Sequence, residues 1–219
     1  MSATGEGNDV PGPYLLPPAL EELAPDVQAE LEALAAVRGY LPQARAVLAR
    51  RPEVLRALNR LDEAVMRTGT VDPALKLLVA ELSSAAAGCR HCQAQTAFAA
   101  HNKGASDEKI ASVWEYDSSP LFNDAERAAL ALAHAASMTP SAARAGHFDR
   151  LREYFDEGEI VEIMSVVCLF GWNNRWNDSV ATQTPPPTLE YAASVLATSG
   201  WGPGKHTRPA DPGTGRGPS

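Results

Sequence analysis

The sequence is poor in the residues that favour β-sheets. Only three of its 219 residues are isoleucine and 6% are aromatic, whereas 38 are alanine. Branched and aromatic side chains favour strands, while alanine and leucine favour helices. No segment shows the sustained alternation of apolar and polar residues that marks a half-buried strand. The composition therefore predicts an all-α protein.

Positive charge and long apolar runs are also scarce. The chain has 19 Lys and Arg against 27 Asp and Glu, which gives a net charge of −8. Nucleic acid is excluded as an expected partner, because phosphate binding needs a surplus of basic residues. No apolar run reaches the roughly 20 residues that cross a bilayer, and the first 18 residues lack the features of a signal peptide. We therefore expect a cytoplasmic protein with no membrane contact.

Cysteine is rare as well, with three in the whole chain. A reducing compartment disfavours a structural disulfide framework, so the closely spaced Cys89 and Cys92 call for a chemical explanation. A structural zinc ion would need two more ligands, and Cys168 stands alone in an apolar run, so we expect no metal and no cofactor. We expect Cys168 to be buried and unreactive. Zinc binding, and an inert pair of buried small residues, are the alternatives to redox chemistry.

Glycine and proline mark the organisation of the chain, because they concentrate at its two ends. We expect a flexible segment over residues 1–18, a single all-helical domain over 19–199 and a disordered tail over 200–219. Half of the residues in that tail are Gly or Pro, and none is an aliphatic larger than alanine. Such a tail cannot bury enough surface to offset its ordering entropy. Deleting residues 203–219 is therefore expected to leave stability unchanged.

Helix signals punctuate the middle of the chain. Pro25 begins a helix that Gly39 ends, and Pro42 and Pro52 begin the next two. Further helices are predicted at about 72–88, 89–103, 106–116, 123–138, 141–155, 158–181 and 188–199. An acidic helix start at residues 106–110 is echoed at 156–160, which suggests an internal duplication.

The strongest chemical signal is the pattern Glu81-x7-Cys89-Arg90-His91-Cys92. Cysteines three residues apart at a helix start lie close enough to form a disulfide. Unpaired backbone N–H groups and the helix dipole lower the pKa of a thiol there, and Arg90 and His91 add charge. We therefore predict a redox-active pair.

Glu81 lies on an otherwise apolar helix face that leads to Cys89. A half-buried carboxylate there would have a raised pKa, which suits proton transfer near neutrality. The alternative is that Glu81 lies at the rim of the core and pairs with an arginine.

His91 is the second candidate for the proton relay. The alternative is that His91 is a solvated histidine in the first turn of its helix. Trp172 and Trp176 indicate a core or subunit interface, and the asparagines beside them are candidates for substrate contact.

Glu81, Cys89-x-His91-Cys92 and the segment Gly104-Ala105-Ser106-Asp107-Glu108-x-Ile110 together resemble the carboxymuconolactone decarboxylase superfamily, in its alkylhydroperoxidase D-like branch. The resemblance spans about residues 40–182 and includes the asparagine- and tryptophan-rich segment 171–178. It implies a duplicated helical fold, a trimer or larger homo-oligomer, peroxide reduction by the cysteine pair, and a dithiol protein that reduces the disulfide. It assigns peroxide attack to Cys92 and resolution to Cys89.

One position departs from the family pattern. The peroxidases usually carry a histidine three or four residues after the second cysteine, where this chain has Gln95 and Thr96. The leading hypothesis is a thiol-dependent hydroperoxide reductase. Its rivals are a cofactor-free isomerase or lyase acting on another small molecule, and a redox-responsive interaction protein without enzymatic activity.

Overall fold

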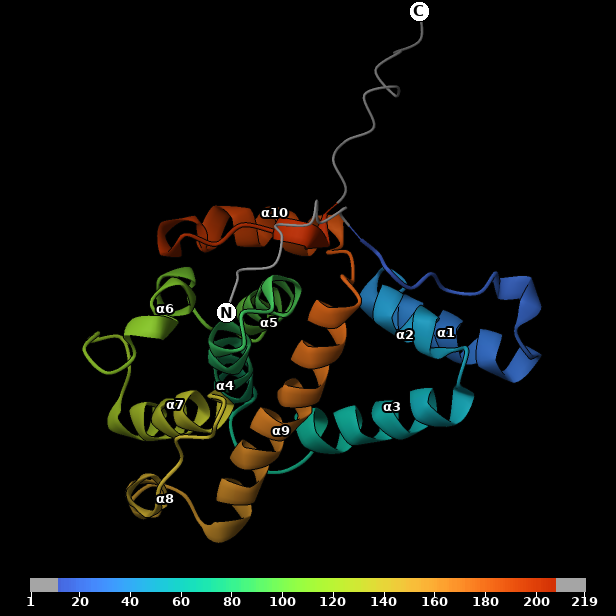
Figure 1. Ribbon diagram of the computed structural model, residues 1–219. Coiled ribbons are helices and arrows are strands. Elements are labelled where there is room, and N and C mark those ends of the chain that lie inside the picture. Colours follow the sequence, from blue (N-terminus) through green and yellow to red (C-terminus); the bar gives the residue numbers. More distant parts are fainter. Residues whose placement is uncertain (1–11, 208–219) are drawn as a thin grey trace, which may run out of the picture.

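The computed structural model describes residues 12–207 (Figure 1). Within this range the chain forms helices and no strand, which confirms the all-α prediction. The α-helices are α1 Pro25–Arg38, α2 Gln43–Leu48, α3 Pro52–Arg67, α4 Pro73–Ala86, α5 Arg90–Asn102, α6 Asp107–Ala111, α7 Asp124–Ser137, α8 Ala145–Leu151, α9 Glu157–Ser179 and α10 Pro186–Val195. Short 3₁₀-helices lie at Leu20–Glu22, Val113–Glu115, Ala197–Ser199 and Gly204–His206. No helix in this part of the chain is long and apolar enough to cross a membrane.

The helix starts follow the predicted side-chain caps. The Asp72 side chain accepts a hydrogen bond from the Leu75 N–H, and Asn123 and Glu126 form a reciprocal capping box. The expected helices 106–116 and 141–155 are shorter than predicted. The first breaks after α6 into a 3₁₀ turn, and the second begins only at Ala145, because residues 141–144 form no regular element.

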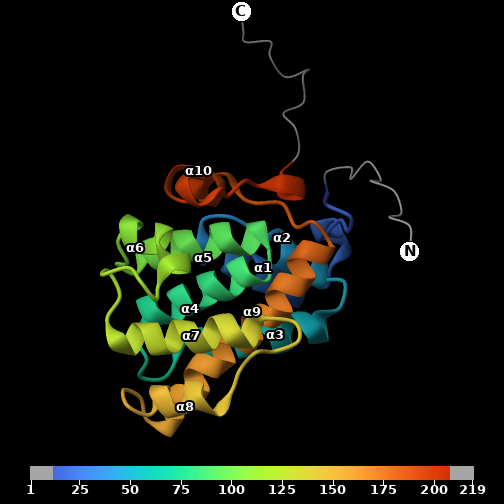
Figure 2. The ribbon, with the colours of Figure 1, turned by 60° about the vertical axis from the view of Figure 1, so that its left-hand side comes forward.

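Helix α4 lies at the centre of the molecule. The helices α10, α5, α4, α7 and α8 form successive layers, each in contact with the next, and α9 crosses this stack (Figure 2). Leu78, Val79 and Leu82 of α4 are completely or almost completely buried. Because neighbours cover α4 on several sides, a polar residue on this helix is held in the interior.

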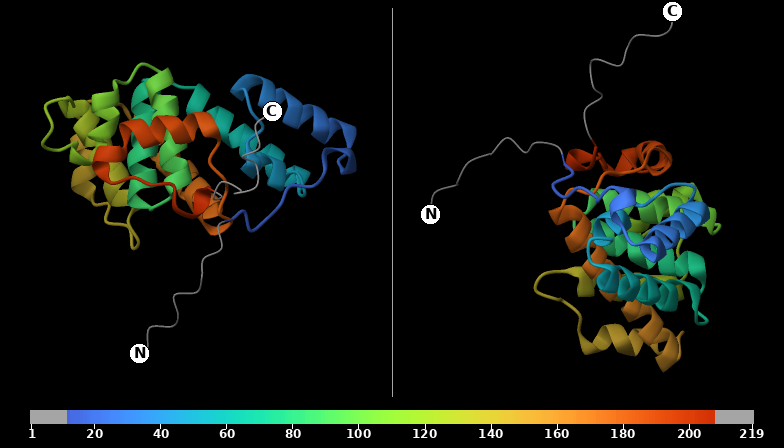
Figure 3. Two further views of the ribbon diagram at one scale, coloured as in Figure 1. Left: turned by 90° about the horizontal axis from the view of Figure 1, so that it is seen from above. Right: turned by 90° about the vertical axis from the view of Figure 1, so that its right-hand side faces the viewer.

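The N-terminal helices form the other side of the molecule. Helix α3 packs against both α9 and α4, and α2 packs on α3. Seen from above, α1 and α2 lie beside the central stack and α10 lies across α5 (Figure 3). Gly39, in the left-handed conformation (φ 75°), ends α1 and allows a sharp turn of the chain. Tyr40, directly after this turn, contacts Gln95 of α5.

The structure corrects the expected domain ends. Trp201 Nε1 donates to the Arg90 carbonyl (3.2 Å), and the His206 ring is buried with Nδ1 2.8 Å from the Thr182 carbonyl. The prediction of disorder is therefore wrong for residues 200–207, because one tryptophan and one histidine supply the buried contacts that Gly and Pro lack. The Tyr14 N–H likewise donates to the Val180 carbonyl, so residues 12–18 are not free of the domain. Residues 1–11 and 208–219 lie outside the described part.

Deleting residues 203–219 should therefore destabilise the protein. The deletion removes the His206 contacts with Thr182 and Asp178 and the hydrogen bond from the Thr184 N–H to the His206 carbonyl. Loss of these buried hydrogen bonds should lower the free energy of unfolding by about 1–3 kcal/mol, measured by urea denaturation. A chain ending at Thr207 is the matched control, since it keeps every one of these contacts. Equal stability of the two truncated chains would contradict the prediction.

Candidate active site

The two cysteines lie at the start of α5, directly after the turn from α4. Gly88 takes a left-handed conformation (φ 74°), which favours glycine, and allows the sharp turn. Cys89 is the N-cap residue, and its sulfur accepts a hydrogen bond from the Cys92 N–H at 3.4 Å. Both thiols are free and buried. The predicted pair is thus formed by the first turn of one helix.

The environment of Cys92 differs from the expected one. Burial raises the pKa of the Cys92 thiol above its usual range, and the nearby Cys89 adds to this. The expectation of a lowered pKa is therefore wrong for Cys92, because burial outweighs the position at the helix start. Asn177 acts in the opposite direction, since its Nδ2 donates to the Cys92 sulfur at 3.3 Å and stabilises the thiolate.

Asn177 is held in this orientation by a second contact. Thr182 Oγ1 donates to Asn177 Oδ1 at 2.9 Å, which leaves the amide N–H groups directed at the sulfur. Both side chains are buried. The sequence pattern suggested Asn177 only as a substrate contact. The structure shows instead that its amide is a direct partner of the thiol.

Glu81 lies in the centre of α4 and is only 2% exposed. Burial raises its pKa to about 8, although the hydrogen bond with Thr96 lowers it in part. Thr96 Oγ1 lies 2.6 Å from Glu81 Oε2 and 2.8 Å from the Cys92 carbonyl oxygen. The pKa of Glu81 is thus raised as expected. The alternative, a rim position in which Glu81 pairs with an arginine, is wrong. Thr96, at the position of the family histidine, connects the carboxyl group to the cysteine turn.

The proton can occupy two positions in this contact. When Glu81 is ionised, Thr96 donates to its carboxylate. When Glu81 is protonated, its O–H can donate to Thr96 Oγ1, and the threonine hydrogen is then free to reach the Cys92 carbonyl. A pKa of about 8 keeps both forms accessible near neutral pH.

His91 is buried beside these groups rather than solvated. Its Nδ1 lies 3.3 Å from Thr184 Oγ1, and its ring centre lies 5.8 Å from that of His206. Burial, and then the neighbouring His206, lower the His91 pKa to about 3. The imidazole is therefore neutral at physiological pH and does not add the expected positive charge. Within residues 12–207 it makes no hydrogen bond to Glu81 or to either cysteine.

Gln95 occupies the other position where the family pattern has histidine. The Tyr40 hydroxyl donates to Gln95 Oε1 at 2.7 Å, and Gln95 Nε2 donates to Thr188 Oγ1 at 3.4 Å. This side chain therefore connects α5 to the turn after α1 and to α10. Gln95 therefore has a structural role at a position where the family pattern has a histidine for proton transfer.

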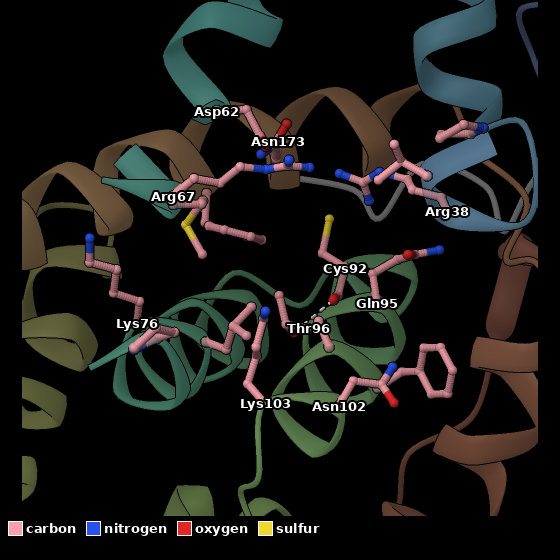
Figure 4. A pocket seen from close by; sticks show the side chains of 18 of the residues that line it. Arg38, Asp62, Arg67, Lys76, Cys92, Gln95, Thr96, Asn102, Lys103 and Asn173 are labelled. Carbon is pink, nitrogen blue, oxygen red and sulfur yellow. Dashed lines mark hydrogen bonds between the residues drawn. The ribbon is translucent and has the colours of Figure 1, made fainter. Parts of the chain in front are cut away.

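A pocket of about 800 Å³ opens over Cys92 (Figure 4). Its lining comes from α1, α2, α3, α4, α5 and α9 and the connections between them, and includes His91, Cys92, Gln95, Thr96, Asn173 and Asn177. Cys89 and Glu81 do not line it. A volume of this order suits a small organic ligand. The pocket thus reaches one cysteine of the pair directly.

Cys168 lies apart from the pair and is exposed on α9, so its predicted burial is wrong. Its apolar neighbours point to other sides of the helix, and the exposed Val161 and Trp172 lie near its own face. Among residues 12–207 no group of three or more His, Cys, Asp or Glu side chains is arranged to hold a metal ion. The zinc alternative therefore finds no ligand set in the described part of the chain.

Part of this chain is similar to a known protein family and to a bacterial protein. Residues 52–135 match the model of the carboxymuconolactone decarboxylase family, a stretch that contains Glu81 and both cysteines of the pair. The uncharacterized protein YnjA of Escherichia coli (strain K12) is 30% identical over 110 residues. That match covers 50% of this chain and 60% of YnjA, less than two thirds of the relative.

Solved structures share the fold. The debrominase Bmp8 matches with a TM-score of 0.76 and 27% identity, over 84% of this chain and 98% of Bmp8. A cysteine-to-alanine variant of Bmp8 has been solved in complex with 2,3,4-tribromopyrrole. A peroxidase-related protein from Ralstonia eutropha JMP134, described as an alkylhydroperoxidase AhpD core, matches with a TM-score of 0.73. At 20% identity, over 80% of this chain and 93% of that one, this likeness shows the fold alone.

The fold and the matched stretch define a helical scaffold of the carboxymuconolactone decarboxylase type. Over residues 52–135 the chain is similar to the carboxymuconolactone decarboxylase family, and its fold is the one found in alkylhydroperoxidase-like structures. The debrominase Bmp8 shows that a protein of similar fold can be an enzyme.

Proposed function

We propose that the protein is a thiol-dependent hydroperoxide reductase. The observation that carries this proposal is the position of Cys92, whose sulfur lies at a pocket with Cys89 within hydrogen-bonding distance behind it. A neighbouring carboxyl group with a pKa of about 8 supplies a proton acceptor. These are the groups that two-electron reduction of a peroxide by a dithiol requires.

In the first step the Cys92 thiolate attacks the outer oxygen of the hydroperoxide. The O–O bond breaks, an S–O bond forms, and the departing alkoxide takes a proton, which gives an alcohol and the Cys92 sulfenic acid. Glu81 accepts the thiol proton, through Thr96 or a water molecule, and returns it to the alkoxide. The Asn177 amide stabilises the thiolate by donating to its sulfur.

In the second step the Cys89 thiolate attacks the sulfenic sulfur. An S–S bond forms and the hydroxyl group leaves as water, so that one hydroperoxide and two thiols give one alcohol, one water and one disulfide. A dithiol protein then reduces the disulfide by thiol exchange. His91, neutral and fixed by Thr184, would hold the wall of the pocket and donate or accept a single hydrogen bond.

Reductive dehalogenation is a second candidate. It is favoured by the likeness to the debrominase Bmp8, which is 27% identical over most of both chains. The same two thiols would supply the electrons, because an aryl bromide and two thiols give the arene, a disulfide and hydrogen bromide. A pocket of about 800 Å³ is large enough for a substituted aromatic ring.

The test adds one equivalent of cumene hydroperoxide to the reduced protein, follows peroxide loss and maps disulfides by mass spectrometry. We expect loss of one equivalent, a Cys89–Cys92 disulfide, and continued turnover when a dithiol is supplied. Cys168 should remain open to alkylation, since it is exposed and outside the pair. Release of bromide from tribromopyrrole with no peroxide loss would favour the second candidate. Activity that survives replacement of both cysteines would favour an isomerase or lyase.

Assembly is part of the same proposal. Trp172 and Trp176 stack on α9 with ring centres 5.4 Å apart, and Trp172 is exposed in the single chain. Exposed aromatic side chains on a long helix are suited to an interface between subunits. We expect this face to contribute to a homo-oligomer of at least three chains.

A further inference from the structure

The charges that line the pocket are strongly unequal. Five of the lining side chains are basic and one, Asp62, is acidic. The chain as a whole has the opposite balance, with a net charge of −8. The basic residues are Arg38, Arg45, Arg67, Lys76 and Lys103. A cationic pocket in an acidic protein is therefore a local feature and does not follow from composition.

Two of the five cations already have partners in the protein. The buried Lys76 Nζ donates to the Val65 and Thr68 carbonyls and lies 2.9 Å from Glu162. Arg45 lies 3.5 Å from Asp62. The charges of Lys76 and Arg45 are therefore balanced by carboxylates of the protein itself.

The other three make no ion pair with any residue between 12 and 207. Arg38, Arg67 and Lys103 come from the C-terminal ends of α1, α3 and α5, and all three are exposed at the rim of the pocket. Figure 4 shows Arg38 and Arg67 extending from opposite sides above the Cys92 sulfur. Three helices thus bring unpaired cations to one opening.

The positive charges also repel one another. Burial lowers the pKa of Arg45, and the nearby charge of Arg38 lowers it further, whereas Asp62 raises it. Cations held this close are stabilised by an anion placed between them. A bound anion would therefore gain from charges that the protein leaves unbalanced.

Apolar side chains form part of the pocket wall. Met66, Leu77, Phe98 and Phe170 line its walls, while Cys92 and Thr96 are only 2% exposed. Charge thus lies at the opening and the reactive sulfur lies deep. A ligand that matches both has an apolar body between an anionic end and the group that meets Cys92.

We propose that the pocket binds organic acids, with the carboxylate of the substrate held by Arg38 and Arg67 and its reducible group directed to Cys92. This rests on the proposed function for the identity of the reducible group, which in that case is a hydroperoxide. The recognition of the acid depends on the charges alone. It can therefore be measured without turnover.

The test measures binding of para-isopropylbenzoate, and of the neutral para-isopropylbenzamide, to the reduced full-length protein by titration calorimetry. We expect the acid to bind about tenfold more tightly, and the preference to shrink as salt is raised. The double variant Arg38→Gln, Arg67→Gln should bind both compounds alike, while the double lysine variant should keep part of the preference. Arg60→Gln is the matched control, since Arg60 is an exposed arginine on α3 that does not line the pocket.

Equal affinity of the wild-type protein for the two compounds, or no binding of either at millimolar concentration, would overturn the proposal. So would an acid preference that persists in the glutamine double variant. A second arm compares cumene hydroperoxide with its para-carboxylate. If neither peroxide is consumed while the benzoate still binds preferentially, the proposed reductase function fails and the acid site stands.

Discussion

Replacing Cys92 with serine should abolish consumption of even the first equivalent of peroxide. Cys92 lines the pocket, and its sulfur receives the hydrogen bond from Asn177 that stabilises a thiolate. Cys89 is completely buried and does not line the pocket. A peroxide in the pocket therefore meets only one of the two sulfurs.

The variant Cys89→Ser should behave differently. It should consume about one equivalent of peroxide and then stop as a sulfenic acid that dimedone traps, because no second thiol is present to form the disulfide. Stopped-flow peroxide loss and mass spectrometry of the dimedone adduct measure the two outcomes. Cys168→Ser is the matched control and should keep the full cycle, since Cys168 is exposed on α9 outside the site.

The position of Cys89 at the start of α5 would favour the opposite assignment. The helix dipole acts most strongly at the start of a helix, where Cys89 lies, and this would favour Cys89 as the attacking thiol. The accessible position of Cys92 and its contact with Asn177 oppose that argument. If Cys89→Ser were the variant without a first turnover, the assignment of attacking and resolving thiols would be reversed. If both variants matched the parent, the redox proposal would fail.

Local signals in the sequence were sufficient for the helical class and for much of the site. Proline, aspartate and asparagine mark helix starts through short-range geometry, as at Pro25, Asp72 and Asn123. Glu81 was identifiable because a carboxylate on an apolar stripe faces the core. The spacing of Cys89 and Cys92 likewise fixed their place on one helix turn.

Contacts between distant parts of the chain could not be inferred in this way. Asn177 reaches Cys92 across 85 positions, and Thr184 reaches His91 across 93. Each contact depends on how α9 and the segment after it pack on α5, which no local pattern encodes. The same holds for His206, whose burial depends on a surface formed by residues far upstream. An indirect signal existed only for Asn177, as one of several asparagines beside the tryptophans of α9.

The second large effect is expected for Glu81→Gln, which should slow the first turnover by about 10²–10⁴-fold. The glutamine keeps the size of the side chain and its hydrogen bond with Thr96 but cannot accept the thiol proton. In the parent, the rate should rise with pH through about 8, where Glu81 ionises. In the variant the rise should move to higher pH, because burial raises the pKa of the Cys92 thiol and no base assists its ionisation.

The matched pair Thr96→Ser and Thr96→Val separates the relay from the packing. Serine keeps the hydroxyl 2.6 Å from the Glu81 carboxyl group and should retain most of the rate, whereas valine keeps the shape without the hydroxyl and should lose much of it. A Glu81→Gln variant with the rate and pH profile of the parent would exclude the carboxyl group from the mechanism.

Glu81→Gln, which should lower the activity, should raise the free energy of unfolding near pH 8. The Glu81 pKa is about 8 in the folded chain against 4.5 ordinarily, so between these values the folded protein holds a proton that the unfolded chain has lost. The free energy of unfolding of the parent therefore falls as pH rises from about 4.5 to 8. Glu81→Gln removes this dependence and should be more stable than the parent at pH 8, by up to a few kcal/mol, with the difference vanishing near pH 4. Urea denaturation at both pH values measures the difference, and a variant less stable than the parent at pH 8 would contradict this prediction.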